Sequence, residues 1–179
     1  MAAAAQVVPV TLTLEEYLRT SYRPDCDFVD GHLEERKMGD TKHSLLQMEL
    51  GFWFLSHRRE WRIRVMSELR TQVSADRVRL PDVAVVIDDG SGTADERART
   101  TPPLIAIEIL SPDDRMNRVI LRLKDYETMG VGNIWVIDPV ERVGFTFAGG
   151  LLRLVEGTRI EVEGSAIYLD LTELFSCLD

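Results

Sequence analysis

The chain has 179 residues, of which 45% are hydrophobic, a size and composition typical of a domain with a substantial core. Its formal net charge of −9 argues against a broad basic surface for duplex DNA, whereas a nuclease with an acidic metal site stays compatible with that charge. The apolar runs are shorter than the roughly 20 residues that a membrane helix needs, so we expect no membrane span.

The sequence shows no targeting signal and no cysteine motif. Residues 1–5 include neither a basic segment nor a long apolar segment, so we expect no signal peptide. Cys26 and Cys177 lack the spacing of a metal site, which favours reduced thiols and a cytoplasmic location. We expect residues 1–12 to form a flexible arm and residues 13–179 to form a single domain.

The first half of the chain predicts two helices, a hairpin and several strands. Thr13 and Glu16 have the spacing of a capping box, which begins a helix. The Asp30-Gly31 pair predicts a tight hairpin turn, because a type I′ turn needs positive φ at both central residues. In chain order the predicted elements are a helix (14–20), a hairpin (26–29 with 32–38), a helix (42–59) and strands (62–66, 69–73 and 81–87).

The helix predicted over 42–59 carries an apolar stripe with helical spacing. We predict this stripe to be the main core face, widened by the neighbouring apolar side chains. The stripe consists of Leu45, Met48, Phe52 and Leu55, and the neighbours are Leu46, Leu50 and Trp53.

The second half predicts an α+β fold. Residues 104–110 are apolar on both faces, as in a central strand. A helix with a core face of Met116, Val119, Leu123 and Tyr126 follows, with Ser111 as its expected cap and Gly130 at its end. The remaining predicted elements are a strand (133–138), a hairpin (143–148 with 151–155), two short strands (158–162 and 167–169) and a last turn (171–175). This order predicts a mixed central sheet flanked by helices.

Two strands that should be buried each carry one carboxylate, Asp82 and Glu108. An ionised carboxylate in an apolar strand is costly unless a positive charge compensates it. Alanine is the same-face neighbour of each acid, which leaves room beside it. If the strands are antiparallel neighbours, which the connection at 88–103 permits, the two acids converge on one point. A hard divalent cation bound through oxygen atoms would compensate both.

Ordinary structural roles compete with this interpretation. Asp82 alone would most often be a turn residue, and Glu108 could belong to a structural ion pair. Lys124, one of three lysines in the chain, could be a solvated helix residue. The row Arg115, Arg118 and Arg122 could be a solvated face rather than a phosphate track. The acids and the lysine together are harder to explain as accidents than any one of them.

At these residues the chain resembles the PD-(D/E)XK nuclease superfamily, and more closely the bacterial Uma-two family of restriction-endonuclease-like proteins. The matching segments are residues 27–31, His43, residues 80–83, residues 107–112, Lys124 with Tyr126, Gly130-Val131 and residues 135–139. The resemblance implies a restriction-endonuclease-like fold in which Asp82 and Glu108 bind metal. Leu110 stands where the superfamily pattern has lysine, and the resemblance implies that Lys124 replaces it. The family's first motif usually begins with glutamate, where this chain has Asp27.

The resemblance also implies an endonuclease that depends on Mg²⁺ or Mn²⁺ and acts on nucleic acid, DNA in the first place. The Ile109 carbonyl would help to hold the cation, and Lys124 would position water or stabilise the phosphate charge. Asp27 or Glu34 would be a further ligand, and His43 and Arg115 would contact substrate.

Two other functions stay open at this point. The first is a catalytically degenerate relative that acts as a dimeric binding or regulatory module. The second is hydrolysis of a small phosphorylated molecule. We expect a homodimer, in which the strands at residues 143–155 could pair between copies.

Overall fold

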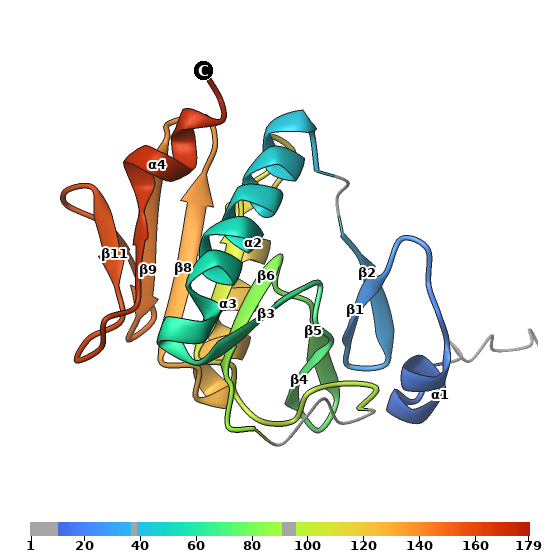
Figure 1. Cartoon of the computed structure of the whole chain (residues 1–179). Coiled ribbons are helices and arrows are strands. Elements are labelled where there is room, and N and C mark those ends of the chain that lie inside the picture. Colours follow the sequence, from blue (N-terminus) through green and yellow to red (C-terminus); the bar gives the residue numbers. More distant parts are fainter. Residues whose placement is uncertain (1–10, 37–38, 91–95) are drawn as a thin grey trace, which may run out of the picture.

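The computed structural model describes residues 11–36, 39–90 and 96–179, and it shows the predicted α+β class (Figure 1). The helices are α1 (Leu14–Arg19), α2 (Thr41–Trp61), α3 (Met116–Met129) and α4 (Leu171–Ser176). The strands are β1 (Cys26–Val29), β2 (His32–Glu35), β3 (Ile63–Ser67), β4 (Thr71–Ser74), β5 (Arg77–Arg79), β6 (Val83–Ile87), β7 (Ile105–Ile109), β8 (Asn133–Asp138), β9 (Val143–Ala148), β10 (Leu151–Leu154), β11 (Arg159–Glu161) and β12 (Tyr168–Asp170).

Parts of three predicted segments lie outside the described residues. They are residues 1–10 of the expected arm, residues 37–38 at the end of the predicted hairpin, and residues 91–95 of the predicted loop. Leu12, also assigned to the arm, donates its backbone N–H to the Gly31 carbonyl at 2.9 Å. Within the described part of the chain, no helix is both long and apolar enough to span a bilayer.

The largest sheet has six strands in the order β10-β9-β8-β7-β6-β3. Strands β7 and β8 are parallel and their neighbours are antiparallel, so the sheet is mixed, as predicted. A second sheet, β2-β1-β5-β4, holds the first hairpin, and β11 pairs with β12. The predicted antiparallel pairing of the two carboxylate strands, β6 and β7, is confirmed.

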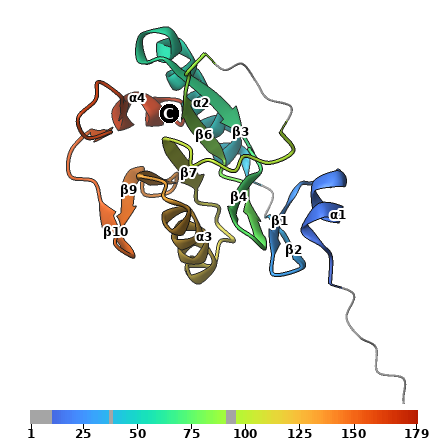
Figure 2. The same cartoon turned by 90° about the horizontal axis from the view of Figure 1, so that it is seen from below.

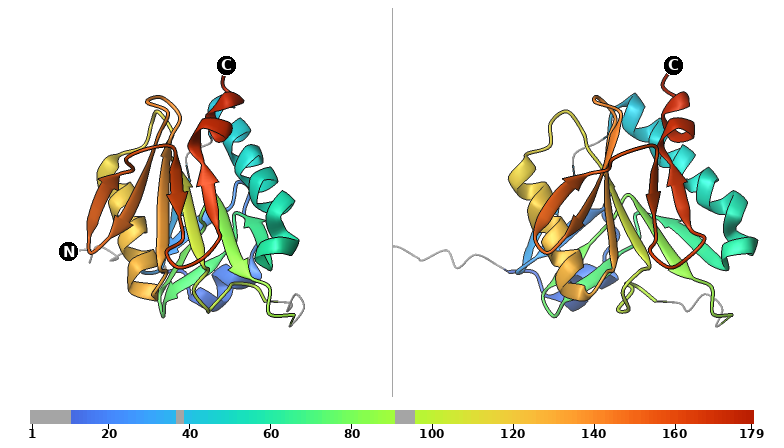
Figure 3. Two further views of the ribbon diagram at one scale, coloured as in Figure 1. Left: turned by 60° about the vertical axis from the view of Figure 1, so that its left-hand side comes forward. Right: turned by 90° about the vertical axis from the view of Figure 1, so that its left-hand side faces the viewer.

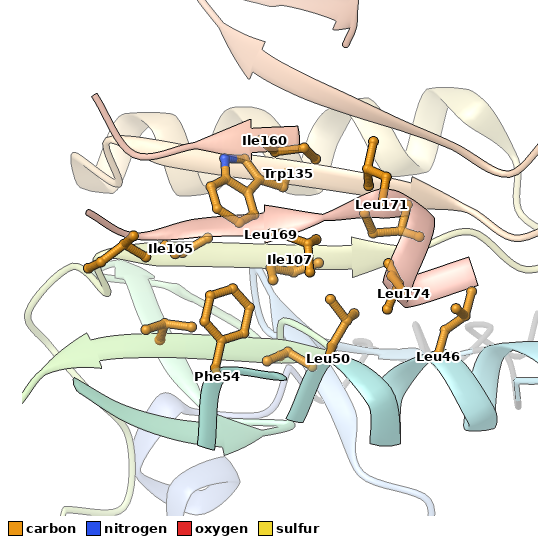
Figure 4. Close-up of a cluster of buried hydrophobic side chains, with 14 of the residues drawn as sticks. Leu46, Leu50, Phe54, Ile105, Ile107, Trp135, Ile160, Leu169, Leu171 and Leu174 are labelled. Carbon is orange, nitrogen blue, oxygen red and sulfur yellow. The ribbon is translucent and has the colours of Figure 1, made fainter. Parts of the chain in front are cut away.

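Helices α2 and α3 cover opposite faces of the six-stranded sheet (Figures 2 and 3). Because side chains alternate along a strand, Ile105 and Ile107 of β7 pack towards α2, whereas Ala106 packs towards α3. Figure 4 shows the core on the α2 side, where α2, β7 and α4 meet. Glu108 has the same parity as Ala106, and so it points to the α3 side.

The predicted tight turns are confirmed. Asp30 and Gly31 have φ values of 51° and 83°, as a type I′ turn requires. Gly149 and Gly150, in the second hairpin, have φ values of 60° and 72°. The capping box of α1 is also present, because Thr13 Oγ1 accepts from the Glu16 N–H at 3.2 Å.

The predicted core face of α2 is wrong in its main stripe, whereas its expected neighbours Leu46 and Leu50 are buried and Trp53 packs against the core. Its four stripe residues are exposed, Leu45 by 43%, Met48 by 74%, Phe52 by 69% and Leu55 by 43%. The side chains that enter the core come from the opposite side of the helix and are Leu46, Leu50, Phe54 and Trp61. The helix has apolar residues on both sides, so periodicity alone could not select the side that packs on the sheet.

Two details of α3 also differ from the prediction. Met116 is 51% exposed, whereas Val119, Leu123 and Tyr126 are buried as expected. Ser111 does not cap the helix, because residues 111–114 form a turn in which Ser111 donates its N–H to the Asp114 carboxylate at 2.8 Å. The helix begins later, at Met116, with Arg115 at the N-cap position.

Leu50→Ala should lower the free energy of unfolding by about 2–5 kcal/mol, because it opens a cavity in the core beneath α2. Leu121→Ala on α3, where the side chain is 53% exposed, should change it by less than about 0.5 kcal/mol. Urea titration followed by circular dichroism measures both. Similar losses of unfolding free energy for the two variants would contradict the assignment of Leu50 to the core and of Leu121 to the surface.

Candidate functional site

Asp82 and Glu108 face each other at one end of the β6–β7 pair. Val83 opposes Ile107 in the sheet register, and one further step brings Asp82 opposite Glu108. Asp82 is 3% exposed and Glu108 is 0% exposed. Two carboxylates withdrawn from water at one point need positive charge or hydrogen-bond donors around them.

Asp82 is held by three donors from different parts of the chain. Its Oδ2 accepts the Ile109 N–H at 2.7 Å and lies 3.4 Å from His43 Nε2, while its Oδ1 accepts from Arg36. Burial raises the pKa of Asp82, but the Arg36 guanidinium and His43 outweigh burial and leave the pKa below its ordinary value. Asp82 is therefore ionised at neutral pH.

Glu108 is held by helix α3. Arg122 Nε donates to its Oε2 at 2.9 Å, and the Tyr126 hydroxyl donates to its Oε1 at 2.7 Å. Burial raises the pKa of Glu108, and the nearby arginines offset only part of this rise. Helical spacing explains the arrangement, because residues four apart lie on the same face of a helix.

Arg36 lies between the two acids. Its Nη2 donates to Asp82 and lies 4.0 Å from Glu108 Oε2. Its Nη1 is buried and has no hydrogen-bond partner among the described residues. The positive charge that the sequence assigned to a cation is thus supplied in this structure by Arg36 and Arg122.

A cavity of about 390 Å³ opens beside these acids. Arg115 and Arg118 are exposed and line it, so the predicted substrate residue Arg115 is at the cavity, as is His43. The described residues that line it are Asp27, Glu34, Glu35, Arg36, His43, Asp82, Ile109, Ser111, Asp113, Asp114, Arg115, Arg118 and Arg122. The cavity therefore combines acids with a cluster of arginines.

Asp27 lines the cavity, but its carboxylate belongs to a separate network of hydrogen bonds and ion pairs. Its Oδ1 accepts the Leu80 N–H at 3.1 Å, and its Oδ2 accepts from Arg79 at 2.9 Å. Arg79 also donates to Glu34 and Asp125, at 2.9 and 2.7 Å. Burial raises the pKa of Asp27 despite these arginines. The network fastens the first hairpin to β5 and α3.

The structure does not bring Lys124 to the cavity. Lys124 is exposed, and the α3 side chain that reaches Glu108 is Arg122. The reason is helical rotation, since residues two apart point roughly 200° away from each other around the axis. Arg122, which the sequence left as a possible solvated residue, has a side chain only 15% exposed.

The donor set agrees in kind with a hard divalent cation. Asp82, Glu108 and the backbone of Ile109 would offer oxygen atoms, which Mg²⁺ and Mn²⁺ prefer. Among the described residues, however, no group of three or more His, Cys, Asp or Glu side chains is arranged to hold a metal ion. A cation would have two carboxylates rather than three, and it would compete with Arg36 for Asp82.

Sequence reasoning missed the roles of Arg36 and Tyr126 in this site. A signal for Arg36 existed, because Asp27 pairs with Glu34 across the hairpin and Arg36 follows on the same face. Tyr126 was predicted as core, and it is buried, but its hydroxyl is a donor to Glu108. Its position four residues after Arg122 was the available signal.

Comparisons with known proteins identify the family and a solved structure of similar fold. A family model named Uma2 and described as "Putative restriction endonuclease" matches residues 14–165. A solved structure, described as a "putative nuclease belonging to DUF820 from Anabaena variabilis ATCC 29413", is similar with a TM-score of 0.79 and 26% sequence identity. The match covers 93% of this chain and 99% of that chain. A search of curated proteins finds no match.

His43 should have a raised pKa in the metal-free protein. Burial lowers the pKa of this imidazole, but the hydrogen bond and charge of Asp82 outweigh burial and raise it. The stability that the pair contributes is complete below about pH 6.5 and is lost as the pH rises through the elevated value. Asp82→Asn should lower the pKa of His43, measured by NMR titration. Asp113→Asn, at the same cavity, is the control, and an unchanged pKa in Asp82→Asn would refute the coupling.

Proposed function

The chain belongs to the Uma2 family, and from this premise we propose that it is a nuclease that hydrolyses phosphodiester bonds of DNA with a divalent cation, Mg²⁺ or Mn²⁺. The observation that carries the proposal is the meeting of Asp82 and Glu108, buried and opposed on neighbouring strands beside an arginine-lined cavity. Such a pair is costly for the fold, so a role in the site accounts for its presence better than stability does.

Asp82, Glu108 and the Ile109 carbonyl would hold the cation. When bound, the cation would neutralise phosphate charge and lower the pKa of a water molecule to make it a nucleophile. The N–H of Ile109 keeps Asp82 oriented at 2.7 Å, and Tyr126 keeps Glu108 oriented at 2.7 Å. Both carboxylates are thus fixed by donors that need not move when the site is used.

Arg36 and Arg122 would act on the phosphate. Arg36 would release Asp82 and turn towards the phosphate. Its Nη1, which has no hydrogen-bond partner within residues 11–36, 39–90 and 96–179, would then donate to the phosphate. Arg122 takes the role that the sequence gave to Lys124, because it lines the cavity and contacts Glu108. A guanidinium suits this role, since it can hold a carboxylate and a phosphate with different N–H groups.

The arginines at the cavity mouth would contact the nucleic-acid backbone. Arg115 and Arg118 give local positive charge to a chain whose total charge is −9. His43, which carries positive charge when protonated, lies on the same cavity. The acting form in this proposal is a homodimer, which would present two such cavities to one nucleic acid.

One observation favours a second function, that of a non-catalytic binding or regulatory module. Each of the two acids is already paired with an arginine, Asp82 with Arg36 and Glu108 with Arg122. In a degenerate relative these pairs would be permanent, and the fold would be retained for binding alone. Calorimetric titration with Mn²⁺ separates the two functions, because only the nuclease needs to bind the ion.

Asp82→Asn and Glu108→Gln should each reduce cleavage of supercoiled plasmid DNA by at least about 100-fold, because each removes a charged cation ligand. The same variants should weaken Mn²⁺ binding in calorimetry. Asp113→Asn is the matched control, since this exposed acid lines the cavity but contacts neither carboxylate. Circular dichroism checks that the variants fold.

Two outcomes would count against the nuclease. Cleavage that persists in Asp82→Asn would show that this acid holds no essential cation. A wild-type protein that neither binds Mn²⁺ at millimolar concentration nor cleaves plasmid DNA would favour the binding module instead.

Arg122 and Lys124 can be separated by one pair of substitutions. Arg122→Gln should lower the rate of plasmid cleavage by about 100-fold or more, because it removes a donor from the site. Lys124→Gln should leave the rate within about twofold, because Lys124 is exposed and outside the cavity. A larger loss of cleavage in Lys124→Gln than in Arg122→Gln, in the same gel assay, would assign the catalytic role to Lys124.

A further inference from the structure

Helix α2 has a second apolar face, which the described residues of the chain leave exposed to water. The four residues Leu45, Met48, Phe52 and Leu55, called the outer stripe below, are exposed by 43, 74, 69 and 43%. They lie on the side of α2 opposite Leu50, which is completely buried. The right-hand view of Figure 3 shows α2 at the margin of the molecule with no other element beyond it.

The outer stripe is large for the surface of a monomer. With about 150–250 Å² for a large side chain, the exposed fractions leave about 400 Å² of apolar area in water. A contiguous apolar patch of this size commonly marks an interaction site. A standard interface buries about 800 Å² on each partner, of which somewhat more than half is apolar. The outer stripe would therefore supply most of the apolar part of one such interface.

The positions of the outer-stripe residues along α2 are symmetric about the middle of the stripe. The four residues are separated by three, four and three positions, with the midpoint at position 50. An antiparallel pairing of two α2 helices about a two-fold axis at this midpoint would place Leu45 against the partner's Leu55. It would also place Met48 against the partner's Phe52. Such a self-complementary contact is what a two-fold dimer requires.

The rest of the outer face is compatible with close packing. Thr41, Ser44 and Ser56 lie on the same face and are small and exposed, so two helices could approach each other. The charges at the two ends are opposite, with Asp40 at the N-cap and Arg59 in the last turn. Antiparallel pairing would bring Arg59 near the partner's Asp40 at both ends of the contact, which is favourable.

We propose that the outer stripe of α2 is the interface of a two-fold symmetric homodimer in which the two α2 helices pack antiparallel. This interface is separate from the cavity, and it holds whether or not the protein cleaves nucleic acid. It differs from the pairing of residues 143–155 expected from the sequence. Strand β10 is an exposed edge, but its apolar residues Leu151 and Leu154 are three positions apart in the strand and therefore point to opposite faces, so they form no single patch.

The mass of the full-length protein in solution tests the proposal. Sedimentation equilibrium should give twice the chain mass of 20.3 kDa. The double variant Met48→Glu with Phe52→Glu should dimerise at least about 30-fold more weakly, because it places four charges at the centre of the contact. It should still fold, since both side chains are largely exposed in one chain. The double variant Leu151→Glu with Leu154→Glu is the matched control and should stay dimeric.

A disulfide tests the antiparallel geometry. Leu45→Cys together with Leu55→Cys should give a covalent dimer on a non-reducing gel after mild oxidation. The two positions lie about 15 Å apart along one helix, too far for a disulfide within a chain, which needs about 7 Å or less between Cα atoms. Either single variant should remain a monomer on the gel, as should wild type, which controls for Cys26 and Cys177.

Three results would overturn the proposal. The first is a wild-type protein that sediments as a monomer at about 100 μM, a concentration well above the Kd of a stable dimer. The second is a dimer that survives Met48→Glu with Phe52→Glu, or that is lost in the β10 control. The third is a dimer that appears only after residues 1–10 are deleted, which would show that the chain's own first segment covers the outer stripe.

Discussion

The structure depends on the burial of two carboxylates at one end of the β6–β7 pair. Asp82 and Glu108 are opposed in register and almost completely withdrawn from water. Charged and hydrogen-bonding groups converge on them from the first hairpin, from α2 and from α3, and these groups offset the cost of withdrawing the two acids from water. These contacts therefore help to determine how the elements pack. Arg36, which follows the first hairpin, donates to Asp82 at the end of the sheet. Arg122 and Tyr126 donate to Glu108 and so fix the rotation of α3 about its axis.

Much of this could be predicted from the sequence where a local rule determines the outcome. The Asp30-Gly31 turn follows from the conformation that its residues tolerate, and the convergence of Asp82 with Glu108 follows from strand alternation and antiparallel pairing. The failures come from interactions that the local pattern does not contain. Lys124 was preferred to Arg122 because the rotation of α3 about its axis depends on packing. Arg36 was missed because its acceptor, Asp82, lies 46 positions away.

Helix α2 is a second case in which the local sequence pattern could not predict the packing. Its sequence offers two apolar stripes, and the choice between them depends on what each one meets. Leu46, Leu50 and Phe54 pack against the sheet and α4 (Figure 4), whereas the described part of the chain leaves the outer stripe exposed. Helix α2 therefore contributes to two sites. At the cavity, His43 contacts the Asp82 carboxylate and Gln47 donates to the Asp82 carbonyl at 3.0 Å. On its other side, the same helix carries the surface proposed to bind a second copy.

The central proposal is that Asp82 and Glu108 form a shared site for a cation and that Arg36 compensates their charge when no cation is bound. The most direct measurement is an anomalous difference map from a crystal soaked in millimolar Mn²⁺. The account predicts a peak bound by both carboxylates, with the Arg36 guanidinium moved away from Asp82. A map without a peak, in which Arg36 still holds Asp82 and Arg122 still holds Glu108, would contradict it.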